Sequence, residues 1–222
     1  DESLAESMLV LFDTDKAVVI DGLPSITIED TYVVNVTPDE TNLDLDGELE
    51  NGATSVTINV LTGTETAYAA DYNLTGGDEL HVDFTDTNDV LTLSSTSSLA
   101  GYNSVTVTNG TLDVSNVDGF SASDIEVASG IKMTAAQFAN VNSINAGSLT
   151  ARVDISINSK ADAILVKDAF AALAGSITGT GKLNVGLQID ESVAGTTEVT
   201  DAVTAASDNV AGSVTQQATD GS

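Results

Sequence analysis

At 222 residues, with a formal net charge of −28, the chain is strongly acidic and long enough for one large or two small domains. That charge excludes nucleic acid and anionic membrane surfaces as partners, because binding to either depends on Lys and Arg. Cysteine is absent, which excludes disulfides and thiolate metal sites. Hydrophobic residues make up 41% of the chain and aromatic residues only 4%, a composition that favours thin β layers.

The basic residues are distributed very unevenly. Between Ala17 and Ile131 the chain has 20 Asp and Glu residues but no Lys or Arg. Carboxylates without protein cations must face water, salt or a bound metal ion. We therefore expect either an extracellular, cell-surface protein or a protein from a high-salt environment, with Ca²⁺ as the first cofactor to consider. No stretch approaches the roughly 20 apolar residues of a membrane span, so the chain is interpreted as a mature secreted product or a piece of a longer one.

Residues 1–71 are expected to form an N-terminal β region, either a small sandwich or the opening turns of a longer stack. Alternating β-branched residues predict strands at Lys16–Ile20, Ser25–Ile28, Thr31–Thr37 and Ser55–Val60. Ahead of these strands, Ser7–Phe12 is an apolar run beside acidic residues. This run either packs in its own core or is donated as a strand to a neighbouring subunit, as in some pili.

Two acidic clusters are candidate metal sites. In the first, carboxylates alternate with leucine and glycine, so that in a strand they would project from one face: Asp44, Asp46 and Glu48. Like charges at that spacing repel unless something neutralises them, and Ca²⁺ takes about six to eight oxygen ligands. Two interpretations stay open, a Ca²⁺ site and a hydrated outer face.

The second cluster follows Gly76 and Gly77 and is denser. Its candidate ligands are Asp78, Glu79, Asp83, Asp86, Asn88 and Asp89. A glycine-rich turn that offers carbonyl oxygens beside Asp side chains is a typical setting for Ca²⁺. We predict a Ca²⁺ site here, in a loop region.

From residue 72 to residue 190 the chain repeats itself imperfectly. Four apolar anchors, Val105, Ile125, Ile144 and Ile177, are separated by 20, 19 and 33 residues. Spacings near 20 match one coil of a β-solenoid, and the longer gap implies an insertion. The insertion has a helical pattern near residues 160–174, with Ser159 or Asp162 as the expected N-cap and Gly175 as the expected C-cap.

Two further segments complete the expected fold. Met133–Val141 is a candidate for a second, shorter helical turn, and residues 191–222 are expected to be short strands or a linker. The predicted fold class is therefore all-β, a strand-rich N-terminal region followed by a β-solenoid-like repeat region with one short inserted helix. With no Cys nucleophile, a single histidine and no phosphate-binding or nucleophile-elbow motif, we expect no enzymatic activity.

The acidic glycine turn at Gly76–Asp89 and the degenerate repeats from Asn88 to Ile189 give the chain a class-level resemblance to known proteins. It resembles bacterial or archaeal surface-layer proteins and RTX-type calcium-dependent surface proteins. The resemblance implies export, Ca²⁺-dependent folding and self-assembly into a layer or filament through strand addition or edge pairing. Two alternatives stay open: an adhesion or ligand-binding module of a larger secreted protein, with cell-surface polysaccharide as a possible ligand, and a viral surface or tail component.

Overall fold

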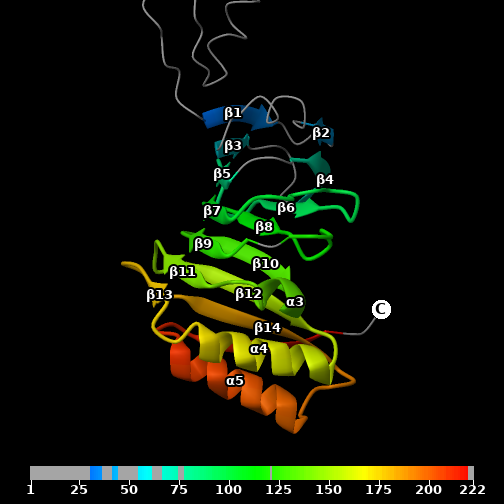
Figure 1. Ribbon diagram of the computed structural model, residues 1–222, viewed down its shortest axis with the longest axis vertical. Coiled ribbons are helices and arrows are strands. Elements are labelled where there is room, and N and C mark those ends of the chain that lie inside the picture. The colour runs from blue at the N-terminus through cyan, green and yellow to red at the C-terminus, as the bar shows by residue number, and fades with distance from the viewer. Residues whose placement is uncertain are drawn as a thin grey trace, which may run out of the picture.

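The computed structural model describes residues 31–36, 42–44, 55–61, 67–74, 78–120 and 122–219. These residues form two parallel β-sheets, and the chain alternates between them strand by strand as far as β14, after which β15 joins the same sheet as β14 (Figure 1). The seven-stranded sheet contains β1 (Thr31–Val36), β3 (Ser55–Val60), β5 (Glu79–Phe84), β7 (Ser104–Thr108), β9 (Asp124–Val127), β11 (Ser143–Ala146) and β13 (Ile177–Thr178). The eight-stranded sheet contains β2 (Asn42–Asp44), β4 (Ala67–Asn73), β6 (Val90–Leu93), β8 (Thr111–Asp113), β10 (Gly130–Thr134), β12 (Arg152–Ile157), β14 (Asn184–Asp190) and β15 (Val214–Thr219).

Three helices accompany the sheets within the described residues: α3 (Ala135–Phe138), α4 (Lys160–Ala172) and α5 (Thr197–Asn209). Each follows a strand of the eight-stranded sheet, and all three lie toward the C-terminal end of the stack (Figure 1). The expectation of an all-β, solenoid-like fold with one short helix is therefore wrong. Parallel strands joined by helical connections make an α/β-like arrangement. None of the described helices has the length and apolarity needed to cross a membrane.

The alternation of the sequence places the core between the two sheets. In β5, Leu80, Val82 and Phe84 are buried while Glu79 and Asp83 are exposed. Side chains of a strand point alternately to its two faces, so the apolar set faces the opposite sheet and the polar set faces solvent. The same pattern in the strands on either side builds one continuous core along the stack.

The repeat anchors are confirmed by the strand register. Val105 pairs with Ile125, Ile125 with Ile144 and Ile144 with Ile177, so the four residues form one column, in which the first three are buried and Ile177 is half-buried. The insertion before the fourth anchor is the segment that contains α4. A repeating sequence thus placed equivalent residues side by side, as stacked repeats require.

The predicted helical insertion is confirmed, with one shift at its end. Ser159 is the N-cap of α4, and its hydroxyl accepts a hydrogen bond of 3.1 Å from the Asp162 amide. The C-cap is Leu173 rather than Gly175, which lies two residues later in the left-handed conformation that glycine favours, with φ +83°. The predicted short helical turn is α3, which Thr134 caps.

The N-terminal predictions are covered only in part. Strands β1 and β3 confirm the predictions at Thr31–Thr37 and Ser55–Val60. Both sheets continue through residue 71, because β3 pairs with β5 and β4 pairs with β6. The predicted strands at Lys16–Ile20 and Ser25–Ile28 and the apolar run Ser7–Phe12 lie outside the described residues.

Candidate functional site

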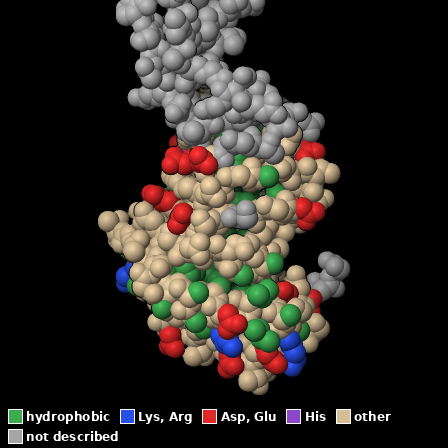
Figure 2. All heavy atoms as spheres, in the orientation of Figure 1, with side chains coloured by type: hydrophobic (Ala, Val, Ile, Leu, Met, Phe, Trp, Pro, Cys, Tyr) green, Lys and Arg blue, Asp and Glu red, His purple; other side chains and the backbone are tan. Residues whose placement is uncertain are grey.

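The outer face of the seven-stranded sheet is polar where β3, β5 and β7 lie side by side. A shallow hollow of about 380 Å³ crosses these strands, lined by Ser55, Thr57, Glu79, His81, Val82, Asp83, Thr106 and Thr108. His81 Nε2 lies 3.6 Å from a Glu79 carboxylate oxygen. Figure 2 shows acidic side chains over the upper part of the described molecule, whereas Lys and Arg side chains appear only over the lower, C-terminal part. The hollow therefore presents acids and hydroxyls in a region of the sequence without Lys or Arg.

Polar side chains on this face pair with their neighbours along the stack. Asp83 Oδ1 accepts hydrogen bonds from the Thr108 hydroxyl and, at 3.2 Å, from the Asn109 side-chain amide. On the other side of β5, the Asn59 side chain of β3 donates a hydrogen bond from Nδ2 to Asn35 Oδ1 of β1 at 2.9 Å. Equivalent positions of parallel strands lie close enough for such ladders. Asp83 is thus already engaged with hydroxyl and amide donors.

The turn between β5 and β6, residues 85–89, holds the most unusual carboxylate of the described structure. Asp89 is only 2% exposed, and its Oδ2 atom is buried without a hydrogen-bond partner. Burial raises the pKa of the Asp89 carboxyl, and the nearby Asp86 carboxylate raises it further. Asp86 Oδ1 accepts hydrogen bonds from the Asn88 amide at 2.9 Å and from the Asn88 side chain at 3.0 Å.

The predicted metal ligands are spread over several places. Asp78 and Glu79 lie at the start of β5, Asp83 lies on the outer face of that strand, and Asp86, Asn88 and Asp89 lie in the turn beyond its other end. A strand of six residues separates its two ends by roughly 17 Å. Among the residues the structure describes, no three His, Asp or Glu side chains gather closely enough to hold a metal ion.

The first acidic cluster falls largely outside the described residues. The backbone of Asp44 ends strand β2, where it pairs with Asn73. Asp46 and Glu48 belong to the part of the chain that is not described. Their role as ligands therefore stays a prediction.

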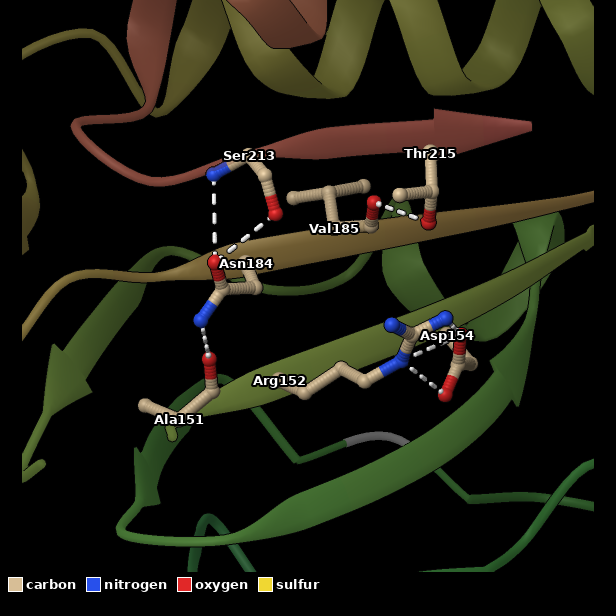
Figure 3. Close-up of polar contacts among 7 residues, drawn as sticks. All are labelled: Ala151, Arg152, Asp154, Asn184, Val185, Ser213 and Thr215. Atoms are coloured by element: carbon tan, nitrogen blue, oxygen red, sulfur yellow. Dashed lines mark hydrogen bonds and ion pairs between the residues drawn. The ribbon is translucent and has the colours of Figure 1, made fainter. Parts of the chain in front are cut away.

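The outer face of the eight-stranded sheet carries an ion pair that the sequence analysis missed. Arg152 binds Asp154 through two nitrogens, with Nη2 at 2.7 Å from Oδ1 and Nε at 2.8 Å from Oδ2 (Figure 3). A Cβ atom at Gly186 on the neighbouring strand β14 would lie 1.8 Å from Asp154 Oδ1. Glycine at position 186 thus leaves the space in which this pair lies.

Asn184 links the starts of three strands of the same sheet. Its Oδ1 accepts hydrogen bonds from the Ser213 amide and hydroxyl, and its Nδ2 donates to the Ala151 carbonyl at 3.1 Å (Figure 3). These contacts join β14 to the segments that lead into β12 and β15. The sequence signal for this role was slight, a single Asn before the apolar run of β14.

A second ion pair, between Lys132 and Asp113, joins β10 to β8. Lys132 Nζ lies 2.8 Å from Asp113 Oδ2, and the Asp113 side chain is only 6% exposed. The remaining donors to this carboxylate come from Ser115, through its amide and its hydroxyl. The lysine thus supplies the positive charge that faces a buried carboxylate.

The Lys132→Met variant should lower the free energy of unfolding by about 2 to 3 kcal/mol, because it leaves Asp113 charged and buried with only neutral donors. Urea denaturation followed by circular dichroism at neutral pH measures the loss. Lys182→Met, at an exposed lysine, should change stability by less than about 0.5 kcal/mol. Adding Asp113→Asn to Lys132→Met should recover part of the loss; if it deepens the loss instead, the charge is not the cause.

The C-terminal end of the stack is incomplete. The seven-stranded sheet ends at β13, whereas the eight-stranded sheet continues to β15. In β15, Gln216 and Ala218 pair in register with the buried residues Leu187 and Ile189 and so face inward, yet both are exposed. Beside β13 lies a hollow of about 160 Å³, lined by Ala146, Ile177, Thr178, Gly179, Gly181, Leu183, Asn209 and Ala211. The hollow thus lies between the last strand of the shorter sheet and the end of α5.

No family model matches this chain, and neither a characterised protein nor a solved structure shows significant similarity to it.

Proposed function

We propose that this chain is an extracellular structural subunit that joins further copies end to end by accepting a strand beside β13. The observation that carries the proposal is the unequal C-terminal end, where the eight-stranded sheet extends one strand beyond the seven-stranded sheet. A strand added to the edge of β13 would lie across the core from β15 and cover its exposed inward-facing residues. Strand addition of this kind derives affinity from main-chain hydrogen bonds and specificity from alternate side chains.

The chemistry of the two edge strands supports this proposal. Strand β15 has the sequence Val-Thr-Gln-Gln-Ala-Thr, with neither charge nor proline, and β13 is the uncharged pair Ile-Thr. Proteins that must stay monomeric commonly protect strand edges with Lys, Pro or bulges. Uncharged and β-prone edges favour pairing with another strand.

The occupant we propose is the apolar run Ser7–Phe12 of a second copy. Its sequence, Ser-Met-Leu-Val-Leu-Phe, is long enough to pair with a short strand and apolar enough to cover the half-buried Ile177 in the hollow. Burial of such side chains supplies about 25 cal/mol per Å² of apolar surface. Strands are parallel throughout both described sheets, so successive copies joined in this way would continue the stack in one direction.

An extracellular setting accords with the composition. A net charge of −28 gives strong repulsion between copies at low ionic strength, and salt or divalent cations reduce it. Assembly should therefore be weak at low salt and promoted by Ca²⁺ or higher ionic strength. This dependence fits a subunit that meets those ions outside the cell.

The experiment compares assembly of the wild-type chain with a variant that blocks the edge. Thr178→Lys places a charge on the exposed end of β13 and should keep the protein monomeric in light scattering and electron microscopy, while the wild type forms filaments or layers. Thr204→Lys, which adds the same charge on the exposed side of α5, should assemble like the wild type. Deletion of residues 1–12 tests the donor and should abolish assembly as completely as Thr178→Lys.

The outcomes separate the proposal from its alternatives. A wild-type protein that stays monomeric across salt and Ca²⁺ concentrations would refute end-to-end assembly. Assembly that persists in both the edge variant and the deletion would show that copies meet through another surface. If Thr178→Lys abolishes assembly but the deletion of residues 1–12 does not, β13 is the acceptor edge and Ser7–Phe12 is excluded as the donor strand.

A second candidate function, an adhesion module for cell-surface polysaccharide, draws on the polar hollow over β3, β5 and β7. Its Glu79, His81 and Asp83 side chains and its hydroxyl groups are hydrogen-bonding partners for sugar hydroxyls. This candidate requires a monomer that binds polysaccharide and loses binding in the Asp83→Ala variant. Calorimetric titration with bacterial cell-wall polysaccharide measures that loss.

A further inference from the structure

The buried carboxylate of Asp89 lacks what a buried charge requires. Asp89 is 2% exposed, and its Oδ2 atom has no hydrogen-bond partner. An ionised carboxylate removed from water is strongly unfavourable unless it is paired, coordinated to a metal or protonated. The backbone around it is held in place, since the Asp89 carbonyl accepts a 2.8 Å hydrogen bond from the Thr111 amide. The turn therefore fixes the carboxylate in its buried position.

A second carboxylate in the same turn increases the need for a cation. Asp86 lies three residues earlier, and the Asp89 amide donates a hydrogen bond of 3.3 Å to the Asp86 carbonyl. No Lys or Arg occurs between Ala17 and Ile131, so the residues around this turn in sequence supply no such cation. A proton would neutralise Asp89 alone, whereas a divalent cation would neutralise both carboxylates.

We propose that the turn of residues 85–89 binds a divalent cation of the Ca²⁺ type, with Asp89 and Asp86 as its carboxylate ligands and the Asn88 side-chain oxygen as a third donor. All three are hard oxygen ligands, which suit Ca²⁺ rather than a metal that favours nitrogen or sulfur. The remaining ligands of an ion that takes about six to eight oxygens would be backbone carbonyls and water. A partial set of protein ligands corresponds to the weak affinities, roughly 0.1 to 1 mM, of extracellular Ca²⁺ modules.

This site differs from the one that the glycine-rich turn suggested. Gly76, Gly77 and Asp78 precede β5, whereas Asp86 and Asp89 follow it, at the opposite end of the strand. Asp83 is excluded from the ligand set because it lies within β5, on the outer face of the sheet, and not in the turn of residues 85–89. Of the six candidate ligands between Asp78 and Asp89, the proposal therefore keeps only the three in the turn after β5. The proposed cation site does not depend on assembly.

The test uses the full chain, with CaCl₂ as the probe and the Thr178→Lys background to keep the protein monomeric. Adding Ca²⁺ to about 100 times its dissociation constant should raise the melting temperature by about 5 to 10 °C. Asp89→Asn should weaken Ca²⁺ binding at least tenfold in calorimetric titration and abolish most of the thermal shift. Asp118→Asn, at an exposed acid in another turn, should leave both unchanged.

A measurement without Ca²⁺ distinguishes a cation site from a protonated carboxyl. If Asp89 is charged and lacks its cation, Asp89→Asn should raise the melting temperature in chelator, because the amide removes an uncompensated buried charge. A wild-type protein that shows neither binding heat nor a thermal shift in roughly 10 mM CaCl₂ would overturn the proposal. So would an Asp89→Asn variant that responds to Ca²⁺ as the wild type does, since the ion would then bind elsewhere on this acidic chain.

Discussion

Phe170→Ala is expected to lower the free energy of unfolding by about 3 to 5 kcal/mol, one of the largest effects of any single substitution in the chain. Phe170 lies in α4 and is fully buried, and its ring centroid is 4.8 Å from that of Phe138 in α3. Truncation removes the aromatic pair and leaves a cavity in a chain with few aromatic residues to refill it. Urea denaturation followed by circular dichroism measures the change.

The control for this prediction lies on the same helix. Ile164→Ala alters a residue that is 44% exposed, so it should cost about 1 kcal/mol or less while changing helix propensity in the same direction. A Phe170→Ala variant no less stable than Ile164→Ala would mean that the helices contribute little to the core. A large loss confined to Phe170→Ala would establish that α3 and α4 are packed as part of the same cooperative unit as the sheets.

The spacing of apolar anchors was the most informative part of the sequence. Val105, Ile125 and Ile144 fall into one column because each circuit through the two sheets has nearly the same length there. The local resemblance of short motifs was less reliable. Gly147-Ser148-Leu149 resembles Gly110-Thr111-Leu112, but Leu149 is 71% exposed, and the residue that pairs with the column of Leu112 and Ile131 is Val153. The connection before β12 is longer than the one before β8, and sequence similarity alone does not reveal how many residues a turn requires.

Helix α5 was missed because composition was given more weight than periodicity. Residues 197–209 are rich in Val and Thr, which favour strands, and were expected to be strands or linker. The buried residues Val199, Ala202 and Ala206 are nevertheless spaced at three and four residues, as one face of a helix requires. This helix, together with α3 and α4, is why the all-β expectation failed.

The candidate cation site was predictable only in outline. The sequence indicated oxygen ligands between residues 78 and 89. Strand β5 places some of these ligands at its start and others beyond its end, and the order of acidic residues along the sequence does not show that separation. The decisive property of Asp89 is burial, and it depends on packing against neighbouring circuits that are distant in sequence. Burial of one particular Asp among many exposed ones carries no local signature.

Gly181→Ala is the second substitution for which we expect a large effect. It should lower the free energy of unfolding by about 3 kcal/mol, near the upper end of the destabilisation that overpacking causes. A Cβ atom at position 181 would lie 1.9 Å from the Ser148 carbonyl oxygen in the connection of the preceding circuit. The obstacle is backbone, so no rotamer change relieves it, and the connection that leads into β14 would have to move. That movement would strain the 2.9 Å hydrogen bond from the Gly181 amide to the Ala146 carbonyl.

Gly147 provides the matched control for this substitution. It occupies the corresponding connection one circuit earlier, where a Cβ atom would make ordinary contact at 3.4 Å with the Cβ of Ala128. Gly147→Ala should therefore be neutral or slightly stabilising, because alanine restricts the unfolded chain more than glycine does. Equal losses in the two variants would show that these connections are not packed as closely as described. A loss confined to Gly181→Ala would also bear on assembly, since Gly181 lines the hollow beside β13 and its displacement should weaken strand addition there.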